Sequence, residues 1–303
     1  MTETTTDLRC SSWTRSQGVD PVGTAGSYAG FLLVEWPLPW PRDISEIPQL
    51  QEVARAAKAA NVRLQGVVPQ GDLALTVGLY LWNPSAARFE GVEAPAGSSP
   101  AKTALALLSG DRPPGTHPIE VVDVLVCGHG RRDRCCGSLG TSLEIELRAG
   151  GPMEASREVR LRRTSHTGGH RFAPTAIVFP EGSSWAFLEA DLLRSIVNRT
   201  ADIDSVLAKY RGCSGWPSPA IQAVERGVLG SIGWDLFDAP RRASDDGNGN
   251  VTFSVDHAGG SRTWKAKVVA GRTLPVPTCG EALTGNEKTE TEMLVEDFAE
   301  QSN

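Results

Sequence analysis

The fold is constrained most by residues Val121 to Val126, a run dominated by β-branched side chains. Such a run is typical of a strand that is buried on both faces of a sheet. The residues directly after it, Cys127 to Gly137, hold three of the chain's six cysteines. Loops that follow buried strands commonly carry functional groups in α/β proteins. The sequence therefore predicts an α/β fold with a functional loop at residues 127–137.

Strand-like and helix-like segments alternate through the chain. Strands are predicted at 31–36, 62–68, 73–82, 121–126, 159–163, 175–179, 251–255 and 263–269, and helices at 51–60, 101–108, 185–197 and 217–228. Residues 138–148 suit either a helix or a strand, because their leucines satisfy both spacings. The 32 glycines and 20 prolines indicate short elements and frequent connections. This alternation predicts the α/β class.

Domain boundaries are expected where glycine and proline interrupt the pattern. The segment GDRPPGTHP at 110–118 is the best linker candidate. We expect an N-terminal α/β domain without cluster ligands at 1–115, and a second domain with the cysteine motif at 116–237. C-terminal strands and an acidic tail are expected at 238–303, with the tail solvated from Glu287 onward.

Composition excludes several classes of protein. The net charge of −6 argues against a general nucleic-acid-binding protein. No apolar run approaches the length of a membrane span, and the polar start, Met1 to Asp7, does not resemble a signal peptide. We expect a cytoplasmic protein with neither nucleic acid nor membrane as a partner. Six cysteines in such a chain do not indicate a disulfide framework.

Two cysteines and two histidines form a candidate metal-ligand set. Cys136 lies nine residues after Cys127, and His166 and His170 are four residues apart within HTGGHRFAP. The intervening Gly168–Gly169 pair favours a tight loop over a helix. Two thiolates and two imidazoles are a complete set for either zinc or a 2Fe–2S cluster.

Other chemistries remain open at this point. Structural zinc sites usually pair cysteines two to four residues apart, a spacing that Cys127 and Cys136 do not have. A zinc-stabilised binding module is nevertheless one alternative, and a metal-free thiol oxidoreductase that uses Cys135 or Cys136 is another. No CxxC motif supports the oxidoreductase. The scattered Cys10, Cys213 and Cys279 are expected to be small buried hydrophobic residues.

Charged side chains surround the cysteines. Arg131, Arg132 and Arg134 are candidates for docking an acidic redox partner and for opposing thiolate charge, although a solvated basic turn would look the same. His129 lies in the same loop and is expected to contact solvent rather than a metal.

The motifs CGHGRRDRCCG and HTGGHRFAP resemble those of the sucrase/ferredoxin-like family, known from actinobacteria and fungi. The segments GTAGSYAGFLLVEWPLPW (23–40), KYRGCSGWP (209–217) and VPTCGEAL (276–283) extend the resemblance over most of the chain. The resemblance implies a thioredoxin-like ferredoxin domain after a cluster-free α/β domain, itself a candidate for a degenerate thioredoxin-like unit. It also implies that Pro174 occupies the cis-proline position of such folds.

The resemblance further implies a 2Fe–2S cluster held by Cys127, Cys136, His166 and His170, with Cys135 as the alternate second thiolate. Histidine ligands make such a site less negative, which raises its reduction potential, as in Rieske centres at roughly −150 to +300 mV. The implied function is electron transfer between donor and acceptor proteins, with proton coupling through a histidine. An electron carrier fits better than an enzyme, and no carboxylate pair stands out to support a sucrase.

Overall fold

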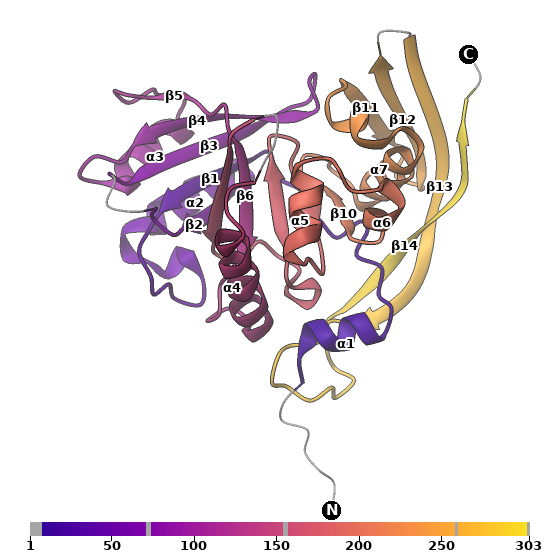
Figure 1. Cartoon of the computed structure of the whole chain (residues 1–303), viewed down its shortest axis with the longest axis horizontal. Coiled ribbons are helices and arrows are strands. Elements are labelled where there is room, and N and C mark those ends of the chain that lie inside the picture. Colours follow the sequence, from indigo (N-terminus) through magenta and orange to yellow (C-terminus); the bar gives the residue numbers. More distant parts are fainter. Residues whose placement is uncertain (1–7, 71–73, 154–156, 258–259, 302–303) are drawn as a thin grey trace, which may run out of the picture.

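The computed structural model describes residues 8–70, 74–153, 157–257 and 260–301. Within these residues the chain forms one ten-stranded mixed sheet and one four-stranded antiparallel sheet, with helices packed around them (Figure 1). No helix among the described residues has the length and apolar character needed to cross a bilayer. The mixture of elements confirms the predicted α/β class.

The helices are α1 (Cys10–Ser16), α2 (Gln51–Ala59), α3 (Pro100–Leu108), α4 (Arg134–Ala149), α5 (Ala190–Val197), α6 (Ile203–Leu207) and α7 (Pro219–Ile232). The large sheet contains β1 (Gly30–Glu35), β2 (Val62–Val67), β3 (Thr76–Asn83), β4 (Arg88–Pro95), β5 (His117–Pro118), β6 (Val122–Cys127), β7 (Val159–Thr164), β8 (Ala176–Phe179), β9 (Ser183–Trp185) and β10 (Tyr210–Cys213). The small sheet contains β11 (Arg241–Asp245), β12 (Asn250–His257), β13 (Gly260–Pro275) and β14 (Thr289–Glu300).

The large sheet contains the same arrangement of four strands twice. Its strand order is β10-β9-β8-β6-β7-β2-β1-β3-β4-β5. β1 pairs parallel with β2 and antiparallel with β3, which pairs antiparallel with β4. β6 pairs in the same way with β7 and β8, and β8 with β9. The two halves join where β2 and β7 pair antiparallel at Val67 and Thr164, so one sheet crosses the predicted boundary near residue 115.

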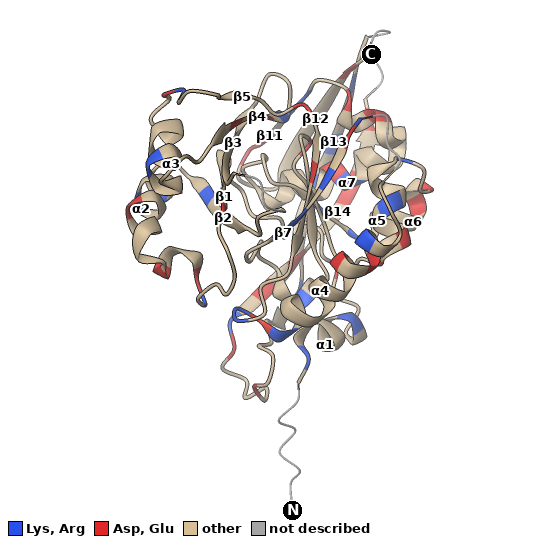
Figure 2. Ribbon diagram, turned by 60° about the vertical axis from the view of Figure 1, so that its left-hand side comes forward, with Lys and Arg blue, Asp and Glu red and all other residues tan. Residues whose placement is uncertain are grey.

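Helices pack against both halves of this sheet. Figure 2 shows α2 and α3 beside the first half of the sheet and α5 to α7 on the opposite side, with α1 close to α4. α4 is the element that positions the cysteine motif, and its helical form resolves the ambiguity at residues 138–148. Leu143 and Leu147 are buried against Val124 of β6, whereas Ile145 is 61% exposed, as expected for one apolar face of a helix rather than alternation in a strand.

A network of buried charges links the two halves of the sheet. Arg162 of β7 forms ion pairs with Glu35 of β1 (2.6 Å) and Glu93 of β4 (3.3 Å). Arg160 pairs with Glu93 (2.9 Å) and with Asp123 of β6 (2.6 Å). Burial raises the pKa of Glu93, but the Arg160 and Arg162 guanidinium groups outweigh it, so that the pKa lies below its usual value.

Most predicted strands and helices are present, but the prediction of a solvated acidic tail is wrong. Instead of a solvated tail after Glu287, residues 289–300 form β14, which pairs along β13. Two contributions explain the strand. Met293 and Phe298 pack against the core beneath α7, and Glu292 forms an ion pair with Arg272 of β13 at 2.7 Å.

Three further differences concern boundaries and missed elements. The helix predicted from Trp185 begins only at Ala190, because Trp185 belongs to β9. The strand predicted from Leu73 begins at Thr76, and Leu73 lies outside the described residues. The elements α1, β4, β5, β10, β11 and α6 were not predicted; most of them are too short to show a clear period of either kind.

Candidate metal centre

The candidate site lies where β6, α4 and the loop before β8 meet. Cys127 is the last residue of β6, and Cys135 and Cys136 lie in the first turn of α4. α4 approaches the end of β6 closely: a Cβ on Gly140 would lie 1.9 Å from the Cys127 carbonyl oxygen. The helix begins at this point because the Asp133 carboxylate accepts hydrogen bonds from the backbone N–H groups of Cys135 (2.8 Å) and Cys136 (3.4 Å).

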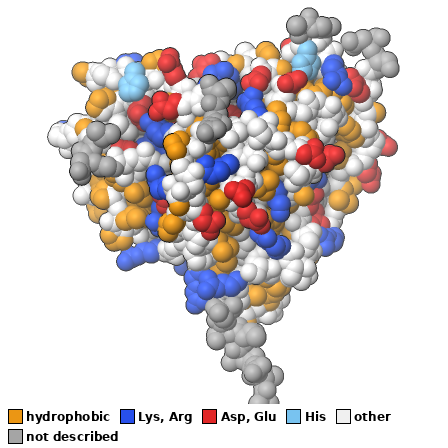
Figure 3. All heavy atoms as spheres, viewed as in Figure 1, with side chains coloured by type: hydrophobic (Ala, Val, Ile, Leu, Met, Phe, Trp, Pro, Cys, Tyr) orange, Lys and Arg blue, Asp and Glu red, His pale blue; other side chains and the backbone are white. Residues whose placement is uncertain are grey.

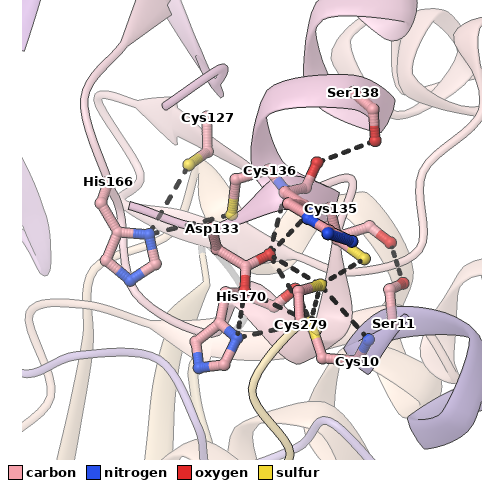
Figure 4. Close-up of polar contacts among 12 residues, drawn as sticks. Cys10, Ser11, Cys127, Asp133, Cys135, Cys136, Ser138, His166, His170 and Cys279 are labelled. Atoms are coloured by element: carbon pink, nitrogen blue, oxygen red, sulfur yellow. Dashed lines mark hydrogen bonds and ion pairs between the residues drawn. The ribbon is translucent and has the colours of Figure 1, made fainter. Parts of the chain in front are cut away.

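Three of the four predicted ligands converge. We call Cys127, Cys136 and His166 site A (Figure 4). Their ligand atoms all lie within 4.8 Å of one another. His166 Nδ1 lies 3.9 Å from Cys127 Sγ and 3.8 Å from Cys136 Sγ, and both thiols are buried. Soft sulfur and imidazole donors in such proximity can hold a transition metal.

The fourth predicted ligand, His170, lies beside site A but faces other groups. Its ring centroid is 6.0 Å from that of His166. Its Nδ1 lies 3.2 Å from Asp133 Oδ2 and 3.4 Å from Cys10 Sγ. Metal-binding histidines commonly donate their other ring N–H to a carboxylate, so the contact with Asp133 suits a ligand that binds through Nε2.

The loop that carries both histidines depends on glycine, as predicted. Gly168 and Gly169 have φ angles of 90° and 73°, in the left-handed region that favours glycine. A Cβ on Gly169 would also lie 2.4 Å from the Arg211 guanidinium. The following Ala173–Pro174 peptide is cis, so that Pro174 is a cis proline.

His129 is not a solvent contact, contrary to the prediction. It is 3% exposed, and its Nε2 donates to the Pro41 carbonyl oxygen at 2.8 Å. Its Nδ1 accepts a hydrogen bond from the backbone N–H of His166 at 3.2 Å. Burial lowers the pKa of His129, which agrees with a neutral ring that donates at one nitrogen and accepts at the other. His129 therefore positions the backbone of His166.

The pKa values of the two thiols of site A are shifted in opposite directions. A hydrogen bond with Cys136 lowers the pKa of Cys127 in spite of burial, and the His166 imidazole lowers it further. The same hydrogen bond, together with burial, raises the pKa of Cys136. A thiol that is readily deprotonated favours metal binding, because the thiolate is the ligand.

The three remaining thiols of this region form a second group, which we call site B: Cys10, Cys135 and Cys279 with the carboxylate of Asp133. Cys279 Sγ lies 3.2 Å from Cys135 Sγ and 3.3 Å from Cys10 Sγ (Figure 4). Cys135 therefore faces away from site A, and in this structure Cys136 is the thiol that faces Cys127. Sequence reasoning treated Cys10 and Cys279 as isolated hydrophobic residues and so missed this group.

Two of the three arginines of the motif contact different parts of the protein. Arg132 approaches Asp43 at 3.9 Å and lines a cavity of about 500 Å³ that also borders Arg63 and His166. Arg134 instead lies beside the loop at Gly280, where its guanidinium is 3.6 Å from the position that a Cβ on Gly280 would occupy. Acidic and basic side chains are interspersed over the face shown in Figure 3.

Comparison with known proteins gives two matches. The family model described as sucrase/ferredoxin-like matches residues 21–212. A fungal protein, "Altered inheritance of mitochondria protein 32" of Meyerozyma guilliermondii, is 34% identical over 94 residues, which are 29% of this chain and 33% of the relative. That match spans about a third of the relative's length. No solved structure matches the chain. Because the family model covers more than half of the chain, including all of site A and His170, the chain belongs to the sucrase/ferredoxin-like family.

Proposed function

We propose that this protein transfers electrons and that it carries a 2Fe–2S cluster on Cys127, Cys136, His166 and His170. The observation that carries the proposal is site A itself, where two buried thiols and the His166 imidazole converge within 4.8 Å. The His170 ring lies next to them, with its Nδ1 occupied by Asp133. This donor set fits the group, because thiolate and imidazole are the two kinds of ligand that hold 2Fe–2S clusters in proteins.

A bound cluster of this kind accepts and donates one electron at a time. The protein's part is to bind it, orient it and set its surroundings. Asp133 holds the ring of His170, and His129 holds the backbone of His166. Because both thiols are buried, water does not reach the sulfur ligands. His166, in contrast, borders the cavity beside Arg63 and Arg132. Burial and second-layer hydrogen bonds are the two means by which a protein tunes such a site.

The fold supports a thioredoxin-like origin for both halves of the large sheet. Each half has a central strand that pairs parallel with one neighbour and antiparallel with the other. Residues 11–116 contain neither cysteine nor histidine, so the first half offers no thiol or imidazole ligand. We infer that the first half is a unit of the same kind without a metal site.

We also propose that the protein works in the cytoplasm with redox partner proteins. All six cysteines are free thiols, as expected in the reducing cytoplasm. Redox donor and acceptor proteins are the expected partners, with Arg131, Arg132 and Arg134 as the docking candidates. Proton coupling is also expected, because an imidazole that reaches solvent can exchange a proton when the charge of the site changes. A reduction potential that falls between pH 6 and pH 9 supports the coupling, and a constant potential contradicts it.

Metal analysis of cysteine variants tests the proposal. Cys127→Ser and Cys136→Ser are expected to lose most of the iron and the visible absorption. Cys213→Ser is the matched control, because Cys213 is equally buried but its thiol donates to the Glu181 carbonyl oxygen, away from site A. Iron that persists in both site A variants would contradict the proposed ligands.

A further inference from the structure

We propose that site B is a second metal centre, which binds one zinc ion through Cys10, Cys135, Cys279 and Asp133. The inference does not depend on the nature of the group at site A. Cys10 and Cys279 also lie outside residues 21–212, so the family match does not include two of the three thiols.

The spacing of the ligand atoms fits one tetrahedral ion. Zinc binds sulfur at about 2.3 Å and carboxylate oxygen at about 2.0–2.2 Å, so around a tetrahedral ion two sulfurs lie roughly 3.8 Å apart and a sulfur and an oxygen roughly 3.6 Å apart. Cys279 Sγ lies 3.2 Å from Cys135 Sγ and 3.3 Å from Cys10 Sγ. Cys10 Sγ and Cys279 Sγ lie 3.6 and 3.5 Å from Asp133 Oδ1. The sulfur–oxygen distances match those around a single ion, and the two sulfur–sulfur distances are shorter by about half an ångström, so a bound ion would move these thiols slightly apart.

A disulfide explains the arrangement less well. A disulfide requires a sulfur–sulfur distance of about 2.05 Å and joins only two thiols. Here Cys279 is almost equally distant from Cys10 and Cys135, which suits a common centre rather than one bonded pair.

A role as hydrophobic filler also fails to explain the surroundings. The buried apolar cluster that contains these thiols consists of the cysteines of both sites and Ala173, without a leucine, valine or aromatic side chain. The neighbours are instead polar: the buried carboxylate of Asp133 and the imidazole of His170. Burying a carboxylate against several thiols is costly unless a cation or hydrogen bonds compensate for it. The backbone N–H groups of Cys135 and Cys136 and the His170 imidazole compensate part of this cost, and a zinc ion would supply a cation as well.

The backbone around site B supports ligand thiolates. The N–H of Cys10 donates to Cys279 Sγ at 3.4 Å, and the N–H of Gly280 donates to the Leu8 carbonyl oxygen at 2.9 Å. Cys135 lies in the first turn of α4, where the helix dipole stabilises a negative charge. The Arg134 guanidinium lies beside the loop at Gly280, on the same side.

The centre would join three segments that are far apart in the sequence. Cys10 opens α1, Cys135 lies in α4, and Cys279 lies in the loop between β13 and β14. A zinc ion at this point would fasten α1 and that loop to the helix that carries Cys136 of site A. We infer that the ion is structural, because its four protein ligands leave no position open for a substrate.

Elemental analysis of the purified full-length protein tests the inference. Wild-type protein is expected to hold about one zinc per chain besides the metal at site A. Cys10→Ser and Cys279→Ser are expected to lose at least about nine-tenths of that zinc while they keep the metal and spectrum of site A. Cys213→Ser again serves as the control and keeps both.

Cobalt(II) provides a measurement on the wild-type protein that does not rely on a variant folding. Zinc-depleted protein loaded with cobalt is expected to show the intense visible bands of a tetrahedral thiolate site, and these bands weaken strongly in Cys279→Ser. Zinc-free wild-type protein that takes up neither zinc nor cobalt at these thiols overturns the inference. So does loss of iron, rather than zinc, from Cys10→Ser and Cys279→Ser.

The outcomes also separate this inference from the proposed function. Two zinc ions per chain, one lost with Cys127→Ser and the other with Cys279→Ser, would refute the iron–sulfur proposal and leave the inference about site B intact. Iron at site A together with three freely reactive thiols at site B would refute the inference about site B and leave the iron–sulfur proposal intact.

Discussion

Cys135 and Cys136 are consecutive residues whose thiols belong to different ligand groups. Cys136 Sγ lies 3.8 Å from His166 Nδ1 in site A, and Cys135 Sγ lies 3.2 Å from Cys279 Sγ in site B. Consecutive residues of a helix point about 100° apart, so the first turn of α4 can face two sites at once. Asp133 caps this turn and contacts His170, which connects the two sites through one carboxylate.

Asp133 is expected to contribute both to helix stability and to metal retention. Asp133→Ala removes the cap of α4 and should lower the free energy of unfolding by about 1 kcal/mol more than Asp133→Asn, because asparagine also caps helices well. Both variants remove the charge beside His170 and should weaken metal binding about tenfold or more. Urea unfolding and metal titration measure the two effects. Equal unfolding free energies for the Ala and Asn variants would contradict the capping role.

Gly140 is expected to tolerate no side chain. Alanine normally favours a helix over glycine by about 1 kcal/mol. At this position its Cβ would lie 1.9 Å from the Cys127 carbonyl oxygen, and neither backbone can move without displacing a ligand. Gly140→Ala should therefore destabilise the protein by at least about 2 kcal/mol and reduce metal content.

Gly78→Ala is the matched control for Gly140. The nearest atom to a Cβ there lies 3.5 Å away, an ordinary contact. A Gly140→Ala variant as stable as the Gly78→Ala variant would show that α4 does not need this close approach.

The buried Arg162 is expected to be essential for joining the two halves of the sheet. Its side chain is 2% exposed, and Arg162→Met leaves Glu35 and Glu93 without this buried partner. Breaking a buried ion pair on one side costs about 3–5 kcal/mol. Arg242→Met is the control, because Arg242 and Asp256 form an exposed pair, and exposed pairs contribute little to stability. Thermal unfolding distinguishes the two, and similar losses would contradict the prediction.

Acid should weaken the same network. The pKa of Glu93 lies below its usual value of 4.5 in the folded protein, so its ion pairs stabilise the fold above that value. The stabilisation is lost as the pH falls from about the unfolded pKa through the lower folded pKa. Urea unfolding between pH 7 and pH 3 should show a steeper loss of stability for the wild type than for Glu93→Gln. Parallel curves would exclude Glu93 as a cause of acid sensitivity.

The sequence predicted the elements around site A well, because its signals are local. The buried strand before Cys127 and the Gly168–Gly169 loop are each visible within about ten residues. The convergence of Cys127, Cys136 and His166 itself depends on the pairing of β6 with β7, which aligns Cys127 with Thr164. The orientation of His170 was less accessible, since it depends on a contact with Asp133, which lies in another segment of the chain.

Site B and the continuous sheet could not be predicted in this way. Cys10 and Cys279 are 269 residues apart, and nothing local to either indicates the other. The pairing of β2 with β7 likewise depends on a register that links residues 67 and 164. The error over β14 has another cause: its acidic residues suggested solvation, whereas Arg262 and Arg272 of the adjacent strand form ion pairs with two of them.

The most direct test of the proposed function is an anaerobic visible spectrum of the wild-type protein, combined with iron and acid-labile sulfide analysis. We predict a brown protein with two irons and two sulfides per chain, whose colour bleaches on reduction. A colourless protein with zinc at site A and no sulfide would contradict electron transfer and leave a metal-stabilised fold.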